Sequence, residues 1–384
     1  MSRFLPLALA AGLLFAETPI MWDVKPHQST IKENAVQDLY ININFEVPES
    51  PNQKTRTPVN ISLVIDRSGS MGEDNKMQHA IGASQYLVNH LNDKDALSVI
   101  EYDNEVTILQ KQGATWNNAI LTNKLGTLSP RGGTNLSGGM LAGFAEVATH
   151  KHLEYINRVI LLSDGNANQG IRQPHEIYAA VRNAKKNSAS ISTIGMGIDY
   201  NEDLMQGIAE HGGGRYYYVE STSQMKRIFQ EELSRIFTTV AKDVSLEVQT
   251  LAGATQANVL GQNAKIVKSI STLEIEDFYS GENRSFIIKV KANGLNSDIA
   301  QIKLKYTNPN DKKTHVLTST IKVKLSQNEK EITAARNDKV FEEAKLMEID
   351  LEHKKVLDQY EKGNIQQAKG ILKQLNLTTA SFNA

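Results

Sequence analysis

The 384-residue chain contains no cysteine, and this absence removes several kinds of protein from consideration. Disulfide bonds, thiolate zinc sites, a cysteine nucleophile and a lipoprotein anchor are all excluded. An excess of charge is also missing, because 42 lysine and arginine residues face 43 aspartate and glutamate residues. This balance gives no electrostatic attraction to nucleic acid or to an anionic membrane surface. With 40% hydrophobic and 22% charged residues, the composition and length are those of a globular protein of two or three domains.

The first residues predict a secretory signal. Arg3 precedes an apolar run from Phe4 to Phe15, and the polar sequence Glu17-Thr18-Pro19 follows. The run is short for a bilayer span but suits the apolar part of a signal peptide. An uncleaved anchor or an ordinary buried segment are the alternatives, and Leu14 stands where a small residue is usual. We therefore expect an exported protein, periplasmic or extracellular, with a signal peptide at 1–16 and no integral membrane span after its removal.

A strand that ends in polar residues organises the middle of the chain. Leucine and β-branched residues dominate positions 59–65, as in a fully buried strand, and Asp66, Ser68 and Ser70 follow at alternate positions. Their carboxylate and hydroxyl oxygens stand at the carboxyl end of a strand, the edge at which open α/β sheets bind ligands. The plainer interpretation is a capped turn, because aspartate and serine favour turns for backbone reasons alone.

Two further loops are expected at the same edge. A second buried strand at 156–162 is followed by Asp164, and a glycine-bearing loop between the two strands carries Thr134 into a helix. Three loops on one edge of a parallel sheet would supply oxygen donors, without nitrogen or sulfur. Hard cations prefer such ligands, so the predicted cofactor is Mg²⁺ or Mn²⁺, with Ca²⁺ ranked behind them. An open coordination position could then accept an acidic group from a partner.

The segment from Thr57 to Val240 resembles a von Willebrand factor type A (VWA) domain. The resemblance rests on three stretches, Asp66-Arg67-Ser68-Gly69-Ser70, Gly132-Gly133-Thr134-Asn135 and Leu162-Ser163-Asp164-Gly165. It is stronger for bacterial exported members of that family than for inter-alpha-trypsin inhibitor heavy chains or integrin inserted domains. It implies a doubly wound, mostly parallel sheet with an intact metal ion-dependent adhesion site. The metal ligands that it implies are Asp66, Ser68, Ser70, Thr134 and Asp164, with the hydroxyls bound directly and the aspartates often through water.

Alternating patterns outside this segment predict a second module. Apolar and polar residues alternate over 39–47 and in several runs within 244–325, as in a small antiparallel β-sandwich. A lone strand cannot bury its apolar face, so the strand at 39–47 is expected to pair with the later strands. The α/β domain would then be inserted into the β module, with its metal face on the opposite side. Outward lysines of the module are interpreted as a solvated face, with a binding patch as the alternative.

The last part of the chain predicts a helical hairpin. Helical periodicity begins near Ile332, and a turn is expected at Gly363-Asn364. The hairpin should pack on the β module or on a partner. The predicted organisation is a signal peptide at 1–16, an N-terminal strand and linker at 17–56, a VWA domain at 57–240, a β-sandwich at 241–327 and the hairpin at 328–384.

Catalysis finds no support in the sequence. A nucleophile at Ser68 or Ser70 would need a positioned base, and no histidine stands at a recognisable triad spacing. His150 and His152 are interpreted as a solvated helix end, and His175 as a surface residue that could border the metal face. We therefore expect a protein that is not an enzyme and that grips an acidic residue of a protein partner through the metal. The rival is an accessory or scaffolding subunit of a cell-envelope assembly with a structural metal, and a hydrolase ranks below both.

Overall fold

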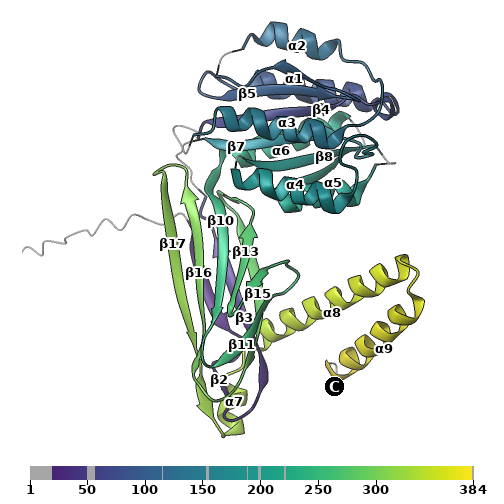
Figure 1. The fold of residues 1–384 in the computed structure, drawn as a ribbon. Coiled ribbons are helices and arrows are strands. Elements are labelled where there is room, and N and C mark those ends of the chain that lie inside the picture. Colours follow the sequence, from purple (N-terminus) through teal and green to yellow (C-terminus); the bar gives the residue numbers. More distant parts are fainter. Residues whose placement is uncertain are drawn as a thin grey trace, which may run out of the picture.

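The protein forms an α/β domain stacked on an elongated β module, with a helical hairpin on the side of that module (Figure 1). This computed structural model describes residues 20–49, 57–114, 116–152, 155–187, 189–197, 200–219 and 222–382. The predicted signal peptide at 1–16 lies outside the described residues. Within the described part of the chain, no helix combines the length and the hydropathy that a bilayer span requires.

A six-stranded sheet in the order β6-β5-β4-β7-β8-β9 forms the centre of the α/β domain. Its strands are β4 (Val59–Asp66), β5 (Ala96–Tyr102), β6 (Val106–Gln110), β7 (Ile156–Ser163), β8 (Ser190–Met196) and β9 (Gly213–Val219). Every neighbouring pair is parallel except β5 and β6. β4 is buried along its whole length, as its nearly continuous apolar sequence predicts for a central parallel strand. The predicted fold class, a mostly parallel α/β sheet, is confirmed.

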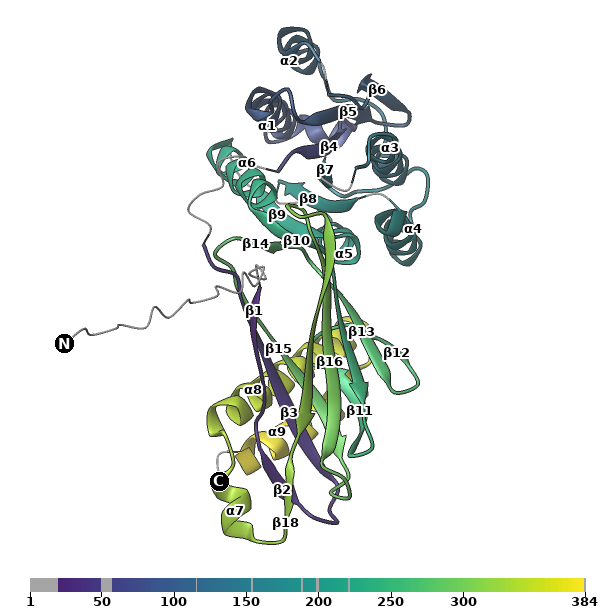
Figure 2. The ribbon, with the colours of Figure 1, turned by 90° about the vertical axis from the view of Figure 1, so that its left-hand side faces the viewer.

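Helices cover both faces of this sheet (Figure 2). α1 (Lys76–His90), α2 (Asn118–Gly126) and α6 (Thr222–Phe237) share one apolar core, and α3 (Leu136–Thr149), α4 (Pro174–Asn187) and α5 (Glu202–Gly212) share the other. A short 3-10 turn, η1 (Gly69–Gly72), lies between β4 and α1. The helices therefore cover both faces of the sheet. The ends of its strands stay available, for ligands at one end and for the β module at the other.

Two antiparallel sheets form the β module. One has the order β1-β3-β15-β11, and the other has the order β12-β13-β10-β16-β17, with β14 also paired to β10. Their strands are β1 (Met21–Pro26), β3 (Gln37–Glu46), β10 (Thr239–Thr250), β11 (Ala254–Val259), β12 (Lys265–Val267), β13 (Ile270–Ile275), β14 (Phe278–Tyr279), β15 (Asn283–Ala292), β16 (Asp298–Asn308) and β17 (Lys313–Lys322). β3 pairs with β15 over ten residues, with Ile41 opposite Ile288. The strand that precedes the α/β domain thus completes a sheet formed after it, which is the predicted insertion.

The earlier part of the C-terminal helical segment packs on the β module. β2 (Thr30–Lys32) pairs in parallel with β18 (Lys324–Ser326), and α7 (Glu329–Ala334), α8 (Asp338–Glu361) and α9 (Ile365–Phe382) follow. Ala344 of α8 packs against Tyr40 and Ile287 of the β module. The Glu348 carboxylate accepts a 2.9 Å hydrogen bond from the Tyr40 hydroxyl and pairs with Lys289 at 2.6 Å. Toward the carboxyl end of α8, the helices α8 and α9 pack against each other and project from the β module (Figure 1).

The β module meets the α/β domain at the amino-terminal edge of the parallel sheet. Arg158 lies near the start of β7, is fully buried, and pairs with Asp277 of the β module at 3.2 Å. The Lys242 ammonium donates a 2.7 Å hydrogen bond to the carbonyl of Tyr155, just before β7. Because β4, β5, β7, β8 and β9 are parallel, their carboxyl ends lie at the edge opposite to these contacts.

Candidate metal centre

Parallel pairing brings the ends of β4 and β7 to the same edge. In the register of these two strands, Ile65 lies opposite Leu162. Asp66 is the last residue of β4, and Asp164 follows directly on the end of β7. Both aspartates are fully buried. The two predicted acidic ligands are therefore neighbours, and the charge of Asp164 acts on Asp66.

Backbone hydrogen bonds fasten the loop after β4 to the loop before α3. The amide of Gly69 donates to the carbonyl of Gly132 at 3.1 Å, and the amide of Arg131 donates to the carbonyl of Arg67 at 2.7 Å. Thr134 stands two residues beyond Gly132, and its side chain is buried. The second loop is thus held against the first, which brings Thr134 to the same edge of the sheet.

The Asp66 carboxylate is oriented by three donors. The amide of Ser68 donates to Oδ1 at 2.8 Å, while the Ser163 and Tyr102 hydroxyls donate to Oδ2 at 2.6 Å and 3.1 Å. Burial raises the pKa of Asp66 to about 6, the hydrogen bonds from Ser163 and Ser68 oppose that rise, and the charge of Asp164 adds to it. A cation beside the two carboxylates would favour their ionised forms. Asp66 is therefore held in one orientation, as supporting residues hold the ligands of metal sites.

The Asp164 carboxylate differs, because it lacks hydrogen-bond donors. Neither of its oxygens has a hydrogen-bond partner among the described residues, although both are buried. The nearest cation that pairs with it is Lys76, whose Nζ lies 3.6 Å from Oδ2. Buried carboxylate oxygens without donors are costly unless a positive charge compensates them. This orphaned carboxylate fits a metal ligand, and it is the strongest sign that the residues present suit a divalent cation.

The serine hydroxyls complete the donor set on the β4 side. Ser68 Oγ lies 3.2 Å from Ser70 Oγ, so the two hydroxyl oxygens are neighbours. No group of three or more His, Cys, Asp or Glu side chains with metal-binding geometry occurs in the described part of the chain. A site here would therefore combine two carboxylates with hydroxyl oxygens, a donor set that suits Mg²⁺ or Mn²⁺.

The histidines weighed in the sequence stand apart from this donor set. His150 and His152 pack against each other and against Tyr155 after the end of α3. His175 lies in the first turn of α4 with an exposed side chain. In the hydrogen bonds of the described residues, no histidine contacts Ser68 or Ser70.

Three residues that support the site were not identified from the sequence. Ser163 and Tyr102 hold Asp66, and Lys76 faces Asp164. Ser163 is adjacent to Asp164 in the sequence, which is a weak local signal. The roles of Tyr102 and Lys76 depend on the pairing of β4 with β5 and on the path of α1, and neither is encoded in a local pattern.

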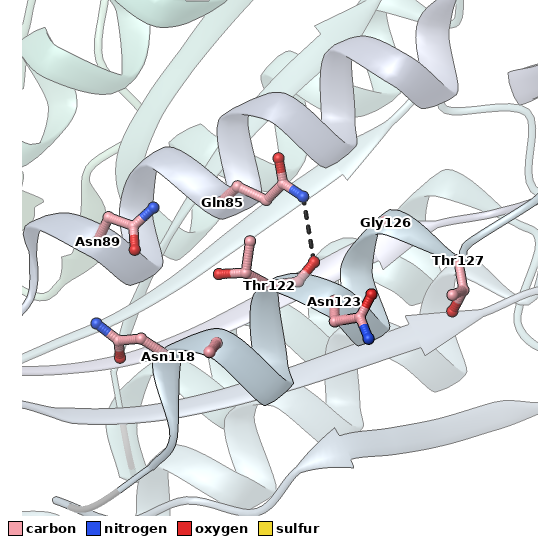
Figure 3. Close-up of a pocket in the computed structure, with 8 residues that line it drawn as sticks. Gln85, Asn89, Asn118, Thr122, Asn123, Gly126 and Thr127 are labelled. Carbon is pink, nitrogen blue, oxygen red and sulfur yellow. Dashed lines mark hydrogen bonds between the residues drawn. The ribbon is translucent and has the colours of Figure 1, made fainter.

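A cleft of ≈ 620 Å³ lies elsewhere on the domain, between α1 and α2 (Figure 3). Carboxamides and hydroxyls line it, and the Gln85 side chain donates a 3.1 Å hydrogen bond to the carbonyl of Thr122 across the two helices. It contains none of the five predicted ligands. The candidate metal centre therefore lies at an edge of the sheet, away from this cleft.

Residues 60–231 match the sequence model of the von Willebrand factor type A domain. The chain therefore contains a VWA domain, in agreement with the sheet order and the helices on both faces. Among solved structures, the chain is similar to a von Willebrand factor type A protein from Catenulispora acidiphila, with a TM-score of 0.73, 16% identity and coverage of 95% of this chain and 88% of that one. A second similar structure is the ArnB paralog VWA2 from Sulfolobus acidocaldarius, with a TM-score of 0.64, 15% identity and coverage of 95% and 91%. At these identities the similarity shows the fold alone.

The curated relatives are distant in sequence. The uncharacterized protein YfbK of Escherichia coli K12 is 24% identical over 308 residues, which are 74% of this chain and 53% of that protein. The human inter-alpha-trypsin inhibitor heavy chain H3 is 26% identical over 195 residues, or 48% of this chain and 22% of that protein. The chain thus spans about half of the first relative and less than a quarter of the second. These relatives support a VWA domain, a kind of domain that commonly mediates protein–protein interaction.

Proposed function

We propose that the protein is a divalent-metal-dependent, protein-binding module of an exported protein. Mg²⁺ or Mn²⁺ would be held by Asp66, Ser68, Ser70, Thr134 and Asp164. An acidic residue of a protein partner would occupy a remaining coordination position, so that the metal joins the two proteins. The module acts by binding, without catalysis, in the periplasm or outside the cell.

The observation that carries this proposal is the Asp164 carboxylate. It is fully buried, both of its oxygens lack hydrogen-bond donors among the described residues, and it lies beside Asp66. Two buried carboxylates beside serine hydroxyls make an environment in which a divalent cation compensates charge that the protein leaves largely uncompensated. They lie at the edge of the sheet opposite to the contact between Arg158 and the β module, where a partner would have to reach the ion.

Metal binding is tested first, by calorimetry with Mg²⁺ and with Mn²⁺ on the full chain. Wild-type protein should bind one ion, and Asp164→Ala should lose that binding. Asp93→Ala is a matched control, because Asp93 is exposed and lies before β5, at the opposite edge of the sheet. No binding of either ion to a folded wild-type protein would refute the proposal.

Partner binding is tested by capture with the immobilised protein, with and without EDTA. Capture should require the metal and should disappear in Asp164→Ala but not in Asp93→Ala. A partner that is retained in EDTA and by Asp164→Ala would exclude the adhesion mechanism.

The second candidate is an accessory or scaffolding subunit of a cell-envelope assembly, with a structural metal. The hairpin supports it, because Leu346, Leu357 and Tyr360 of α8 are exposed on a helix that projects from the module. This candidate predicts capture that survives EDTA and is lost when the hairpin residues are changed. A hydrolase ranks below both, and it would show turnover that depends on Ser68 or Ser70.

A further inference from the structure

A buried lysine faces the candidate metal centre. Lys76 is the first residue of α1, and it is 3% exposed. Its Nζ lies 3.6 Å from Oδ2 of Asp164 and donates a 3.5 Å hydrogen bond to the carbonyl of Ser70. The ammonium group thus contacts one predicted metal ligand directly and the backbone of a second.

The position of Lys76 has no explanation in the helix that carries it. Lysine is rarely buried, and a cation in the first turn of a helix lies against the positive end of the helix dipole. The backbone before it is unusual as well, because Asp74 and Asn75 have φ values of 50° and 58°, in the left-handed region. The favourable interactions of this ammonium are the ion pair with Asp164 and the long hydrogen bond to the carbonyl of Ser70.

The loop after β8 leaves space for the lysine side chain. Gly197 has a φ of 85°, and a Cβ atom at this position would overlap Cε of Lys76. The backbone conformation favours glycine, and a side chain at this position would displace the end of the Lys76 side chain. The aliphatic part of Lys76 is therefore buried, and its ammonium group lies beside Asp164.

We infer that Lys76 is a tethered competitor of the metal ion, which compensates Asp164 in the metal-free protein and lowers the affinity of the site. This inference rests on the proposed metal-dependent function and concerns its regulation. Without the ion, the ammonium pairs with an otherwise unpartnered carboxylate. With a divalent ion at Asp164, the ammonium faces a second positive charge at short distance and loses its pairing.

The same lysine changes the charge that a partner meets. Two carboxylates, one ammonium and one divalent cation leave a single positive charge at the loaded site, whereas the site would be neutral without the lysine. An acidic residue of the partner restores neutrality. Lys76 would therefore make the ion weakly held when the protein is alone and better held in a complex with an acidic partner.

The test compares wild type with Lys76→Met in the full chain, with Mg²⁺ alone as the probe. Methionine keeps an unbranched side chain over Gly197 and removes the charge. Calorimetry should give an affinity for Mg²⁺ at least tenfold higher in Lys76→Met. The metal-free variant should melt at a lower temperature than metal-free wild type, and Mg²⁺ should raise its melting temperature by more than it raises that of wild type.

Two further variants complete the test. Lys94→Met is the control, because Lys94 is exposed at the opposite edge of the sheet, and it should bind Mg²⁺ like wild type. Lys76→Gln serves if Lys76→Met does not melt cooperatively, and it should show the same tighter binding. Unchanged or weaker Mg²⁺ affinity in a folded Lys76 variant, with wild-type binding present, would overturn the inference and leave the metal site intact. Absence of Mg²⁺ and Mn²⁺ binding in wild type and variants alike would overturn the proposed function and, with it, this inference.

Discussion

Replacing Arg158 with methionine should destabilise the joint between the α/β domain and the β module. The Arg158 guanidinium is fully buried and contacts Asp277 at 3.2 Å and the Tyr279 hydroxyl at 3.4 Å, both in the β module. It also lies 3.9 Å from Glu232 of α6. One side chain thus links β7, α6 and the β module.

The magnitude follows from what remains when the arginine is removed. Glu232 keeps hydrogen bonds from the Ser192 hydroxyl at 2.5 Å and the Tyr217 hydroxyl at 2.7 Å. Asp277 loses its ion pair, and its pKa is already raised by burial although Arg158 opposes that rise. Removal of one partner of a buried pair costs about 3–5 kcal/mol of unfolding free energy, because the other charge stays buried. In the double variant Arg158→Met/Asp277→Asn, the unpaired buried charge is removed as well. This variant should recover about 1–3 kcal/mol of the lost unfolding free energy, the size of coupling expected between side chains in contact.

The chain offers a separate fluorescent probe for each part. Its two tryptophans are Trp22, in β1 of the β module, and Trp116, in the α/β domain. In a Trp116→Phe version, the fluorescence of Trp22 therefore follows the urea unfolding of the β module. In a Trp22→Phe version, the fluorescence of Trp116 follows the α/β domain. We expect Arg158→Met to lower both transitions or to separate them, since the joint couples the two parts. Arg182→Met, on the exposed side of α4, is the control. Both transitions within about 0.5 kcal/mol of wild type, the usual range of surface substitutions, would refute a stabilising role for the buried arginine.

Three further predictions concern other parts of the molecule. Burial lowers the pKa of His27 to about 4, so the folded state favours the neutral ring. The contribution of this neutral ring to the free energy of unfolding should be complete above about pH 6.5. The free energy of unfolding should then fall by about 2–3 kcal/mol as the pH drops toward 4. His27→Asn, which keeps an acceptor for the Tyr40 amide, should flatten that pH dependence in urea unfolding, and an unchanged slope would contradict it. Ser163→Ala removes a donor to Asp66 and should weaken Mg²⁺ binding about 10–100-fold in calorimetry; equal affinity would exclude its orienting role. Phe341→Ala should cost about 2 kcal/mol and speed proteolysis of the hairpin, because this ring packs on His27 and Tyr40 at the root of α8; wild-type cleavage rates would argue against that root.

The parts of the fold that the sequence predicted are those with strong patterns. β4 and β7 have nearly continuous apolar runs, and β3 and much of β15 alternate between apolar and polar residues, so their type and their insertion topology could be inferred. α2 was missed, because only Leu121 and Leu125 of this nine-residue helix are buried and no apolar stripe is visible. β1 was missed as well, since its alternation is weak and its pairing with β3 depends on residues far along the chain.

The outer face of the β module shows what a strand pattern cannot predict. Alternation correctly separates the two sides of β15, but it does not tell what covers the outward side. Lys289 and Ile287 point to that side, and α8 lies over them. Lys289 therefore anchors a helix, whereas Lys305, on β16, is exposed as a solvated face requires. The covering helix comes from a distant part of the sequence, so only the structure could distinguish these lysines.

The five predicted ligands could be named because four of them lie at, or just beyond, the ends of strands and the fifth in a glycine-bearing loop. Their support could not be named from the sequence. Tyr102 reaches Asp66 because β5 lies beside β4 in a register that places the two residues opposite each other. Lys76 reaches Asp164 because Gly197 leaves a path for it. Both depend on three-dimensional packing between segments that are far apart in the sequence.

Two of the buried charge clusters of the α/β domain lie at opposite ends of one strand, β7. Arg158 stands near the start of β7 and Asp164 just past its end, six residues further on and therefore about 20 Å away along an extended chain. Perturbations at the two ends should be separable: Arg158→Met should change stability while leaving Mg²⁺ affinity unchanged, and Ser163→Ala should change the affinity more than the stability of the joint. If Arg158→Met weakened Mg²⁺ binding, the joint and the metal centre would have to be coupled through β7 or α6. Independence is expected, because the contacts that orient Asp66 come from β5, β7 and the first loop, and none comes from the β module.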